Sequence, residues 1–149
     1  MVFCLLCNVI ACGGELSSEE GRFASPGYPG NYPDRAECVW ILGGAPGNKV
    51  RLTFLSLDIE ESTGCNGDYV EIHAGSEEGT LLGHYCGSDV PDGIQSTSIA
   101  NVTGTSLEAE TLWIKFNSDA IGTRSGFLAQ YSLGNINIGV CACRRFSFR

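Results

Sequence analysis

The chain has 149 residues, of which 43% are hydrophobic, and it carries a formal net charge of −8 from 17 acidic and nine basic side chains. This hydrophobic content supports one folded domain rather than a disordered chain, and no apolar run reaches the ~18 residues that span a bilayer. The acidic balance argues against nucleic-acid binding, which requires a basic face, and suits cations or basic partners.

Both ends of the chain differ from its middle. Residues 1–11 are apolar but shorter than the roughly 15–30 residues of a complete secretory signal. We interpret them as a truncated signal-like segment or the start of a fragment. Residues 132–149 form an unassigned C-terminal tail, of which residues 141–149 share no pattern with the rest. The cysteines in these two segments are left without an assigned role: Cys4, Cys7, Cys141 and Cys143.

Between these ends, apolar and polar residues alternate with period 2, and no helical periodicity is visible. The alternation predicts strands over 49–57, 68–75, 112–118 and 126–132, separated by turns rich in Gly, Pro, Asn and Asp. This pattern indicates an all-β antiparallel sandwich or barrel. Trp113 is expected to face outward as an ordinary sheet aromatic, with a binding role as the alternative. The residues expected to face inward are Val50, Leu52, Phe54, Val70, Ile72, Leu112, Ile114, Phe116, Phe127, Ala129 and Tyr131.

Eight cysteines in a chain of this size indicate an oxidising, extracellular setting. Cys12, Cys38, Cys65 and Cys86 are scattered singly, whereas zinc sites place their ligands in close pairs. We therefore expect these four to form disulfides. Their spacing leaves all three possible pairings open.

The stretch from Leu57 to Ile72 carries five carboxylates, which points either to a bound cation or to solvated surface charge. The stretch is not an EF-hand loop. Counted from Asp58, the sixth position is Thr63, where that loop needs glycine, and the twelfth is Tyr69, where it needs glutamate. A calcium site would have to be assembled from separate parts of the chain. Solvation is the expectation for Asp58, Glu61, Glu71, Glu77 and Glu78.

Several motifs, in one order along the chain, resemble a CUB domain. The first are Cys-Gly-Gly at Cys12, the Ser-Pro-Gly-Tyr-Pro-Gly-Asn-Tyr-Pro run that ends at Pro33, and Cys38-Val-Trp40. The later ones are Leu57-Asp-Ile-Glu60, Cys65-x-x-Asp68-Tyr69, Tyr85-Cys-Gly87, Phe-Asn-Ser-Asp ending at Asp119, and Gly-Phe-Leu-Ala-Gln-Tyr ending at Tyr131. The resemblance covers residues 12–131. It implies a jelly-roll β-sandwich of two antiparallel sheets with the disulfides Cys12–Cys38 and Cys65–Cys86.

The resemblance extends to the calcium-binding members of that family. It implies that Glu60, Asp68 and Asp119 supply side-chain oxygens to Ca²⁺, that the Ile121 carbonyl adds another, and that Tyr32 orients Glu60. Three carboxylates that converged without a cation would repel one another and have raised pKa values. Solvated loop charge is the alternative.

The function implied by the resemblance is a secreted, non-catalytic, calcium-dependent protein-binding module. In it, Glu60, Asp68 and Asp119 are presented to an exposed Lys or Arg of an extracellular partner. The alternatives are a non-catalytic module of a larger secreted protease, astacin/tolloid-like or complement-type, and a calcium-free structural matrix module. No H-E-x-x-H or G-x-S-x-G motif is present, and His73 and His84 are the only histidines. Asn101, in an Asn-Val-Thr sequon, is a predicted glycosylation site.

Overall fold

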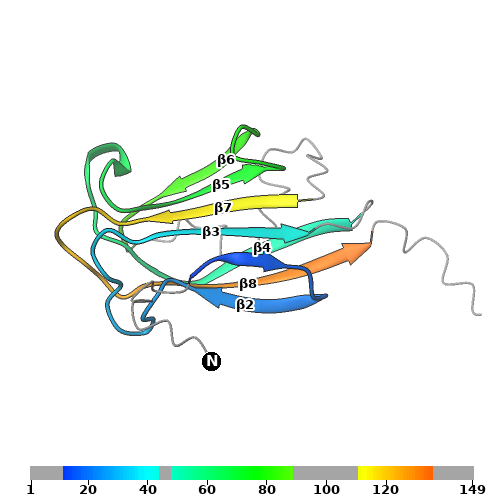
Figure 1. The fold of residues 1–149 in the computed structure, drawn as a ribbon, viewed down its shortest axis with the longest axis horizontal. Coiled ribbons are helices and arrows are strands. Elements are labelled where there is room, and N and C mark those ends of the chain that lie inside the picture. The colour runs from blue at the N-terminus through cyan, green and yellow to red at the C-terminus, as the bar shows by residue number, and fades with distance from the viewer. Residues whose placement is uncertain (1–11, 44–47, 89–110, 136–149) are drawn as a thin grey trace, which may run out of the picture.

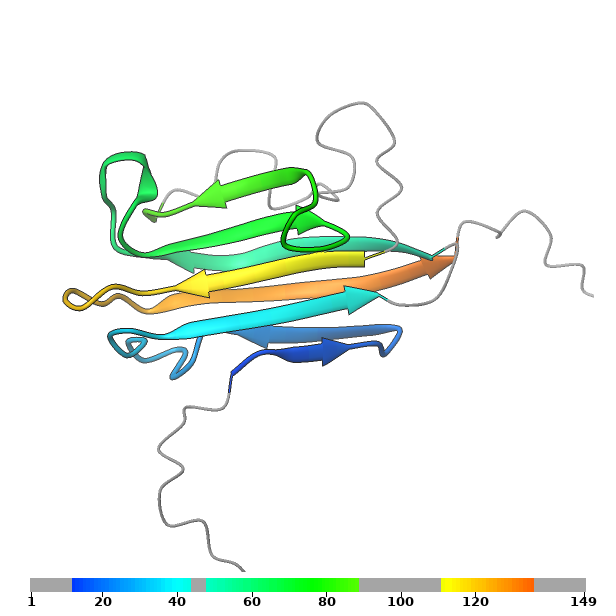
Figure 2. The same ribbon diagram turned by 45° about the horizontal axis from the view of Figure 1, so that its top comes forward.

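The computed structural model describes residues 12–43, 48–88 and 111–135, and within them eight strands form two packed sheets (Figures 1 and 2). In these ranges no helix is long and apolar enough to cross a membrane. The expectations for Cys4, Cys7, Asn101, Cys141 and Cys143 concern residues outside the described ranges.

The first sheet has five strands in the order β1-β3-β7-β5-β6. These are β1 (Gly14–Leu16), β3 (Glu37–Gly43), β7 (Thr111–Asn117), β5 (Tyr69–Ala74) and β6 (Leu81–Tyr85). All neighbours are antiparallel except β1 and β3, which run parallel. The prediction of purely antiparallel sheets is therefore wrong at β1. The Cys12–Cys38 disulfide explains the exception, because it holds the start of β1 beside the start of β3.

The second sheet has three strands in the order β2-β8-β4, all antiparallel. These are β2 (Glu20–Ala24), β8 (Gly126–Asn135) and β4 (Asn48–Asp58). The pairing of β4 with β8 shifts at a bulge between Phe54 and Ser56. Leu55 is the extra residue and is 44% exposed, whereas Phe54 and Leu57 are both buried. The bulge thus turns Leu57 inward, although strict alternation from Phe54 would face it outward.

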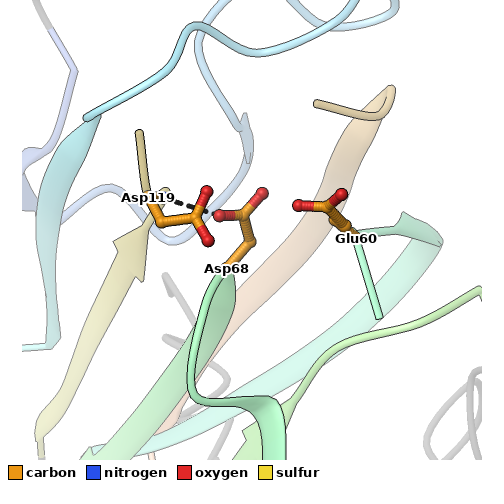
Figure 3. Close-up of side chains that lie close together, drawn as sticks. All are labelled: Glu60, Asp68 and Asp119. Carbon is orange, nitrogen blue, oxygen red and sulfur yellow. Dashed lines mark hydrogen bonds between the residues drawn. The ribbon is translucent and has the colours of Figure 1, made fainter. Parts of the chain in front are cut away.

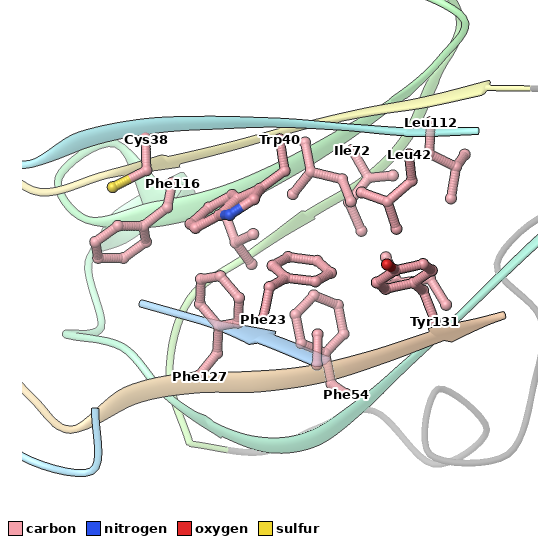
Figure 4. Close-up of a cluster of buried hydrophobic side chains, with 14 of the residues drawn as sticks. Phe23, Cys38, Trp40, Leu42, Phe54, Ile72, Leu112, Phe116, Phe127 and Tyr131 are labelled. Carbon is pink, nitrogen blue, oxygen red and sulfur yellow. The ribbon is translucent and has the colours of Figure 1, made fainter. Parts of the chain in front are cut away.

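The core lies between the two sheets (Figure 4). It contains every residue that the alternation predicts to face inward. Phe127 of β8 is at its centre. Its ring makes edge contacts with the rings of Phe23, Trp40, Phe54 and Phe116, with centroids 5.6 to 5.9 Å apart. Aromatic rings from both sheets therefore interlock in one core.

Trp113 does project from the outer face of the five-stranded sheet, but its side chain is only 9% exposed. Its ring packs edge-on against His73 of the neighbouring strand, with centroids 5.3 Å apart. The alternative of an outward binding tryptophan is therefore wrong, because the ring is buried.

The two disulfides are those that the family resemblance implies, Cys12–Cys38 and Cys65–Cys86. The second joins the short 3₁₀ turn η1 (Thr63–Cys65) to the end of β6. The connections β2–β3, β4–β5 and β7–β8 all lie at one end of the sandwich, on the left in Figure 1. This end brings together the segments that carry Tyr32, Glu60, Asp68 and Asp119.

Candidate metal centre

Three carboxylates meet at this end of the sandwich. Glu60, Asp68 and Asp119 each offer an oxygen, and these oxygens lie within 4.8 Å of one another. Figure 3 shows Asp119 and Asp68 side by side, with Glu60 across from them. We call these three residues the acidic cluster. It combines one residue after β4, one before β5 and one after β7.

The sheet pairing explains why these distant residues meet. Tyr69 at the start of β5 pairs with Asn117 at the end of β7. Asp68, just before β5, and Asp119, just after β7, therefore lie at the same end of two adjacent strands. The Asp119 N–H donates a hydrogen bond to Asp68 Oδ1 at 2.6 Å. Glu60 comes from the other sheet, where Ile59 forms a two-way backbone bridge to Gly87.

Two glycines leave room for the carboxylates. Gly122 has φ +86°, and a Cβ built there would collide with the Glu60 carboxylate. At Gly67 a Cβ would lie 2.8 Å from Asp119 Oδ2. The backbone approaches the acidic cluster so closely that these positions accept only glycine without rearrangement.

Tyr32 is 1% exposed and links two members of the acidic cluster. Its hydroxyl donates to Asp68 Oδ2 at 2.5 Å and accepts the Glu60 backbone N–H at 3.1 Å. Burial raises the pKa of Tyr32, and its hydrogen bond to Asp68 raises it further. Tyr32 was expected to orient Glu60. The contact it makes there is with the main chain, and the carboxylate it holds is that of Asp68.

Asp68 is the buried member of the acidic cluster, with 1% exposure. Burial raises the pKa of its carboxyl, and the charge of Asp119 acts in the same direction. The hydrogen bonds from Tyr32 and from the Asp119 N–H oppose this rise. A nearby cation would favour the charged carboxylate and offset the cost of burying it.

Asp119 is the least buried carboxylate of the acidic cluster. Its Oδ1 accepts the Ile121 N–H at 3.1 Å, and its carbonyl accepts the Arg35 N–H at 2.8 Å. The Ile121 side chain is 77% exposed. These backbone bonds hold the Asp119 turn in place beside the other two acids.

The remaining acids of the Leu57–Ile72 stretch lie outside the acidic cluster. Asp58 accepts a hydrogen bond from Ser125 Oγ at 2.9 Å. Glu71 is not the solvated surface charge that was expected, because its carboxylate contacts His73 Nε2 at 2.6 Å and His84 Nδ1 at 3.2 Å. This contact has no signal in the sequence beyond the alternation that places Glu71 and His73 on one strand face.

The donor set of the acidic cluster is made of hard carboxylate oxygens. Oxygens of this kind, gathered from several loops, suit a cation such as Ca²⁺, which takes six to eight oxygen ligands. Among the described residues this is the one group of three or more His, Cys, Asp or Glu side chains close enough to share a metal ion.

The CUB domain family model matches residues 12–131. Rat cubilin is 42% identical over 130 residues, which is 86% of this chain and 3% of cubilin. Human tolloid-like protein 1 is 40% identical over 121 residues, which is 80% of this chain and 11% of that protein. The chain thus spans a small part of the curated relatives that it matches.

Among solved structures, the MASP-1 CUB2 domain bound to Ca²⁺ superimposes with a TM-score of 0.65 and 28% sequence identity. The match covers 82% of this chain and 99% of that domain. CUB domains are non-catalytic modules that occur in extracellular proteins. The motifs, the two-sheet sandwich with its two disulfides and the family match agree, and this chain belongs to the CUB domain family.

Proposed function

We propose that this chain is a calcium-dependent protein-binding module. Glu60, Asp68 and Asp119 hold Ca²⁺ through their side chains, and the Ile121 carbonyl supplies a further oxygen. The observation that carries the proposal is the convergence of three carboxylates from three segments, one of them buried. The similarity to the calcium-bound MASP-1 CUB2 domain supports it.

The cation neutralises most of the charge on the acidic cluster when it is bound. Three carboxylates against a divalent ion leave the site about one unit negative. Asp119 is the least buried of the three, so its carboxylate is the most accessible to a partner, while Tyr32 and the Asp119 N–H keep Asp68 in place. A lysine or arginine side chain of a partner then docks on the fixed carboxylate oxygens by charge-assisted hydrogen bonds.

The setting of this activity is extracellular. Disulfides persist in oxidising compartments, and this chain has two of them. The curated relatives are far longer than the chain, which supports a role as one non-catalytic module among the domains of a larger protein. The partner is an extracellular protein with an exposed basic side chain.

A calcium titration followed by thermal melting tests the metal site. A ligand at 100 times its Kd stabilises the native state by about 2.7 kcal/mol, which raises the melting temperature by several degrees. Asp119→Ala should abolish that rise. Glu61→Gln, which neutralises an exposed acid outside the acidic cluster, should retain it. The absence of any rise in the unaltered chain at millimolar calcium would favour the calcium-free structural module instead.

A second experiment tests the docking of a basic side chain. A protein captured by the chain in the presence of calcium should be released by EDTA and should bind Asp119→Ala poorly. Acetylation of the partner's lysines removes their charge and should weaken binding when lysine is the docking residue. Affinity that does not respond to EDTA would contradict the proposal, even where the melting experiment shows that calcium binds.

A further inference from the structure

A second cluster of titratable side chains lies on the outer face of the five-stranded sheet, apart from the acidic cluster. Its members are Glu71 and His73 of β5 and His84 of β6. His73 Nε2 contacts Glu71 Oε1 at 2.6 Å, and His84 Nδ1 contacts Glu71 Oε2 at 3.2 Å. One carboxylate is thus shared between two imidazoles. We call these three residues the His–Glu–His cluster.

The other nitrogen of each imidazole also faces a hydrogen-bond acceptor. His73 Nδ1 lies 3.0 Å from the Gly79 carbonyl oxygen, and His84 Nε2 lies 3.0 Å from the Cys65 carbonyl oxygen. A neutral imidazole carries a single N–H, so it leaves one nitrogen lone pair pointing at an oxygen. An imidazolium carries two N–H groups and satisfies both contacts. The surroundings of both histidines therefore match the protonated ring.

The neighbouring groups support this reading. Glu77, in the β5–β6 turn, adds negative charge near His73, and Trp113 of β7 packs edge-on against the His73 ring. Tyr69 stacks on His84 with centroids 4.7 Å apart. Lys115 pairs with Glu71 in the strand register, but its ammonium group lies 3.5 Å from Glu37 and so is engaged by another carboxylate.

We propose that the His–Glu–His cluster is a proton-operated clamp, which closes when His73 is protonated and then ties the β5–β6 turn, through the shared Glu71, to the His84 contact that holds the η1 loop on the outer face of the sheet. The turn is tied through the Gly79 carbonyl and the loop through the Cys65 carbonyl. Cys65 lies between Glu60 and Asp68, so the clamp braces the loop that carries two members of the acidic cluster. The clamp itself requires no metal.

The direction of the pH effect follows from the pKa changes. Burial would lower the pKa of His73, but hydrogen bonds to Gly79 and Glu71 outweigh it and raise that pKa above 6.5. The stabilisation from His73 is therefore fully present below pH 6.5 and is lost as the pH rises through the raised value. Burial would raise the pKa of Glu71, but the two histidines hold it below 4.5. The contribution of Glu71 is thus lost only as the pH falls through that lowered value, and the clamp is strongest between about pH 4.5 and 6.5.

The test uses the full chain in EDTA, so that calcium binding plays no part and a failure of the clamp is distinct from a failure of the metal site. Denaturant unfolding at pH 5.5 and 7.5 gives the ratio of the two folding constants. The folding constant at pH 5.5 divided by that at pH 7.5 should be smaller for His73→Gln and for Glu71→Gln than for the unaltered chain. The difference should be up to about tenfold for each unit by which folding raises the pKa of His73. Glu15→Gln, which removes an exposed charge from the same sheet, should leave the ratio unchanged.

NMR titration of the unaltered chain measures the His73 pKa directly, so its result does not depend on how a substitution affects folding. The His73 ring should titrate above pH 6.5, and both its nitrogens should carry protons below that midpoint. In Glu71→Gln, the midpoint should move down. A His73 midpoint at or below 6.5 in the unaltered chain, or equal pH ratios for the unaltered chain and both variants, would overturn the clamp.

Discussion

The Glu60 carboxylate lies against the backbone of Gly122, so a side chain at position 122 would force that carboxylate to move relative to the other two acids. Gly122 also has a positive φ of 86°, a backbone conformation that is strained for any residue with a Cβ, whatever its surroundings. Two separate effects, backbone strain and collision with a carboxylate, therefore act at the same position. They can be separated because Gly75 has a similar φ of 81° but open space around it.

Gly122→Ala should lose the calcium-induced rise in melting temperature, whereas Gly75→Ala should keep it. Both variants should lose about 1–2 kcal/mol of unfolding free energy from the left-handed backbone, but only the first displaces Glu60. Melting curves with calcium and with EDTA measure both effects. Equal calcium responses in the two variants would show that Glu60 is not held by the Gly122 backbone.

At the scale of elements, the Cys65–Cys86 disulfide ties the η1 loop to the end of β6. Glu60 and Asp68 flank this loop, and the Ile59–Gly87 bridge lies beside the disulfide. The Cys12–Cys38 disulfide instead joins the chain before β1 to β3. The two disulfides thus close loops of similar size, with sequence separations of 21 and 26, but only Cys65–Cys86 anchors the segment between Glu60 and Asp68.

Replacing Cys65 and Cys86 together by serine should cost about 3 kcal/mol of unfolding free energy, from the loop entropy of the unfolded chain. The Cys12/Cys38 double replacement should cost a similar amount, which makes it a matched control. Calcium affinity, measured by titration calorimetry under conditions where both variants are folded, should fall further in the Cys65/Cys86 variant because the segment between Glu60 and Asp68 is no longer anchored to the end of β6. Equal affinities would show that the disulfide does not organise the metal site.

At the scale of the whole molecule, the two sheets are held together by one aromatic core. Phe127 contacts rings of both sheets and is fully buried, whereas Leu55 at the bulge in β4 is 44% exposed. The sandwich in turn positions the acidic cluster, because Glu60 comes from one sheet and Asp68 and Asp119 from the other. Stability of the core and geometry of the site are therefore linked.

Phe127→Ala should lower the unfolding free energy by about 3–5 kcal/mol, since it removes buried surface and leaves a cavity between the sheets. Leu55→Ala truncates an apolar side chain of the same sheet that is 44% exposed, so it should lower the unfolding free energy much less. Urea unfolding in the presence of calcium measures both. A small loss for Phe127→Ala would mean that the sheets repack around the missing ring.

Much of the fold could be predicted because a strand's alternation is local. Val50, Leu52 and Phe54 repeat every second residue, and the pleat places such residues on one face whatever the neighbouring strand is. The inward faces of β5, β7 and β8 followed in the same way. The disulfide pairing and the members of the acidic cluster came from the family resemblance, since neither has a local signature.

The sequence by itself thus determined the all-β class, the inward faces and the supply of acids and cysteines, because these depend on side-chain chemistry and a period of two residues. Only the tertiary structure decided the parallel pairing of β1, the bulge that turns Leu57 inward, the burial of Trp113 and the sharing of Glu71 by two histidines. Each of these depends on which distant segment lies alongside. The acidic cluster depends on both. Its three acids are present in the sequence, but the pairing of β5 with β7 brings Asp68 to Asp119, 51 residues further along the chain.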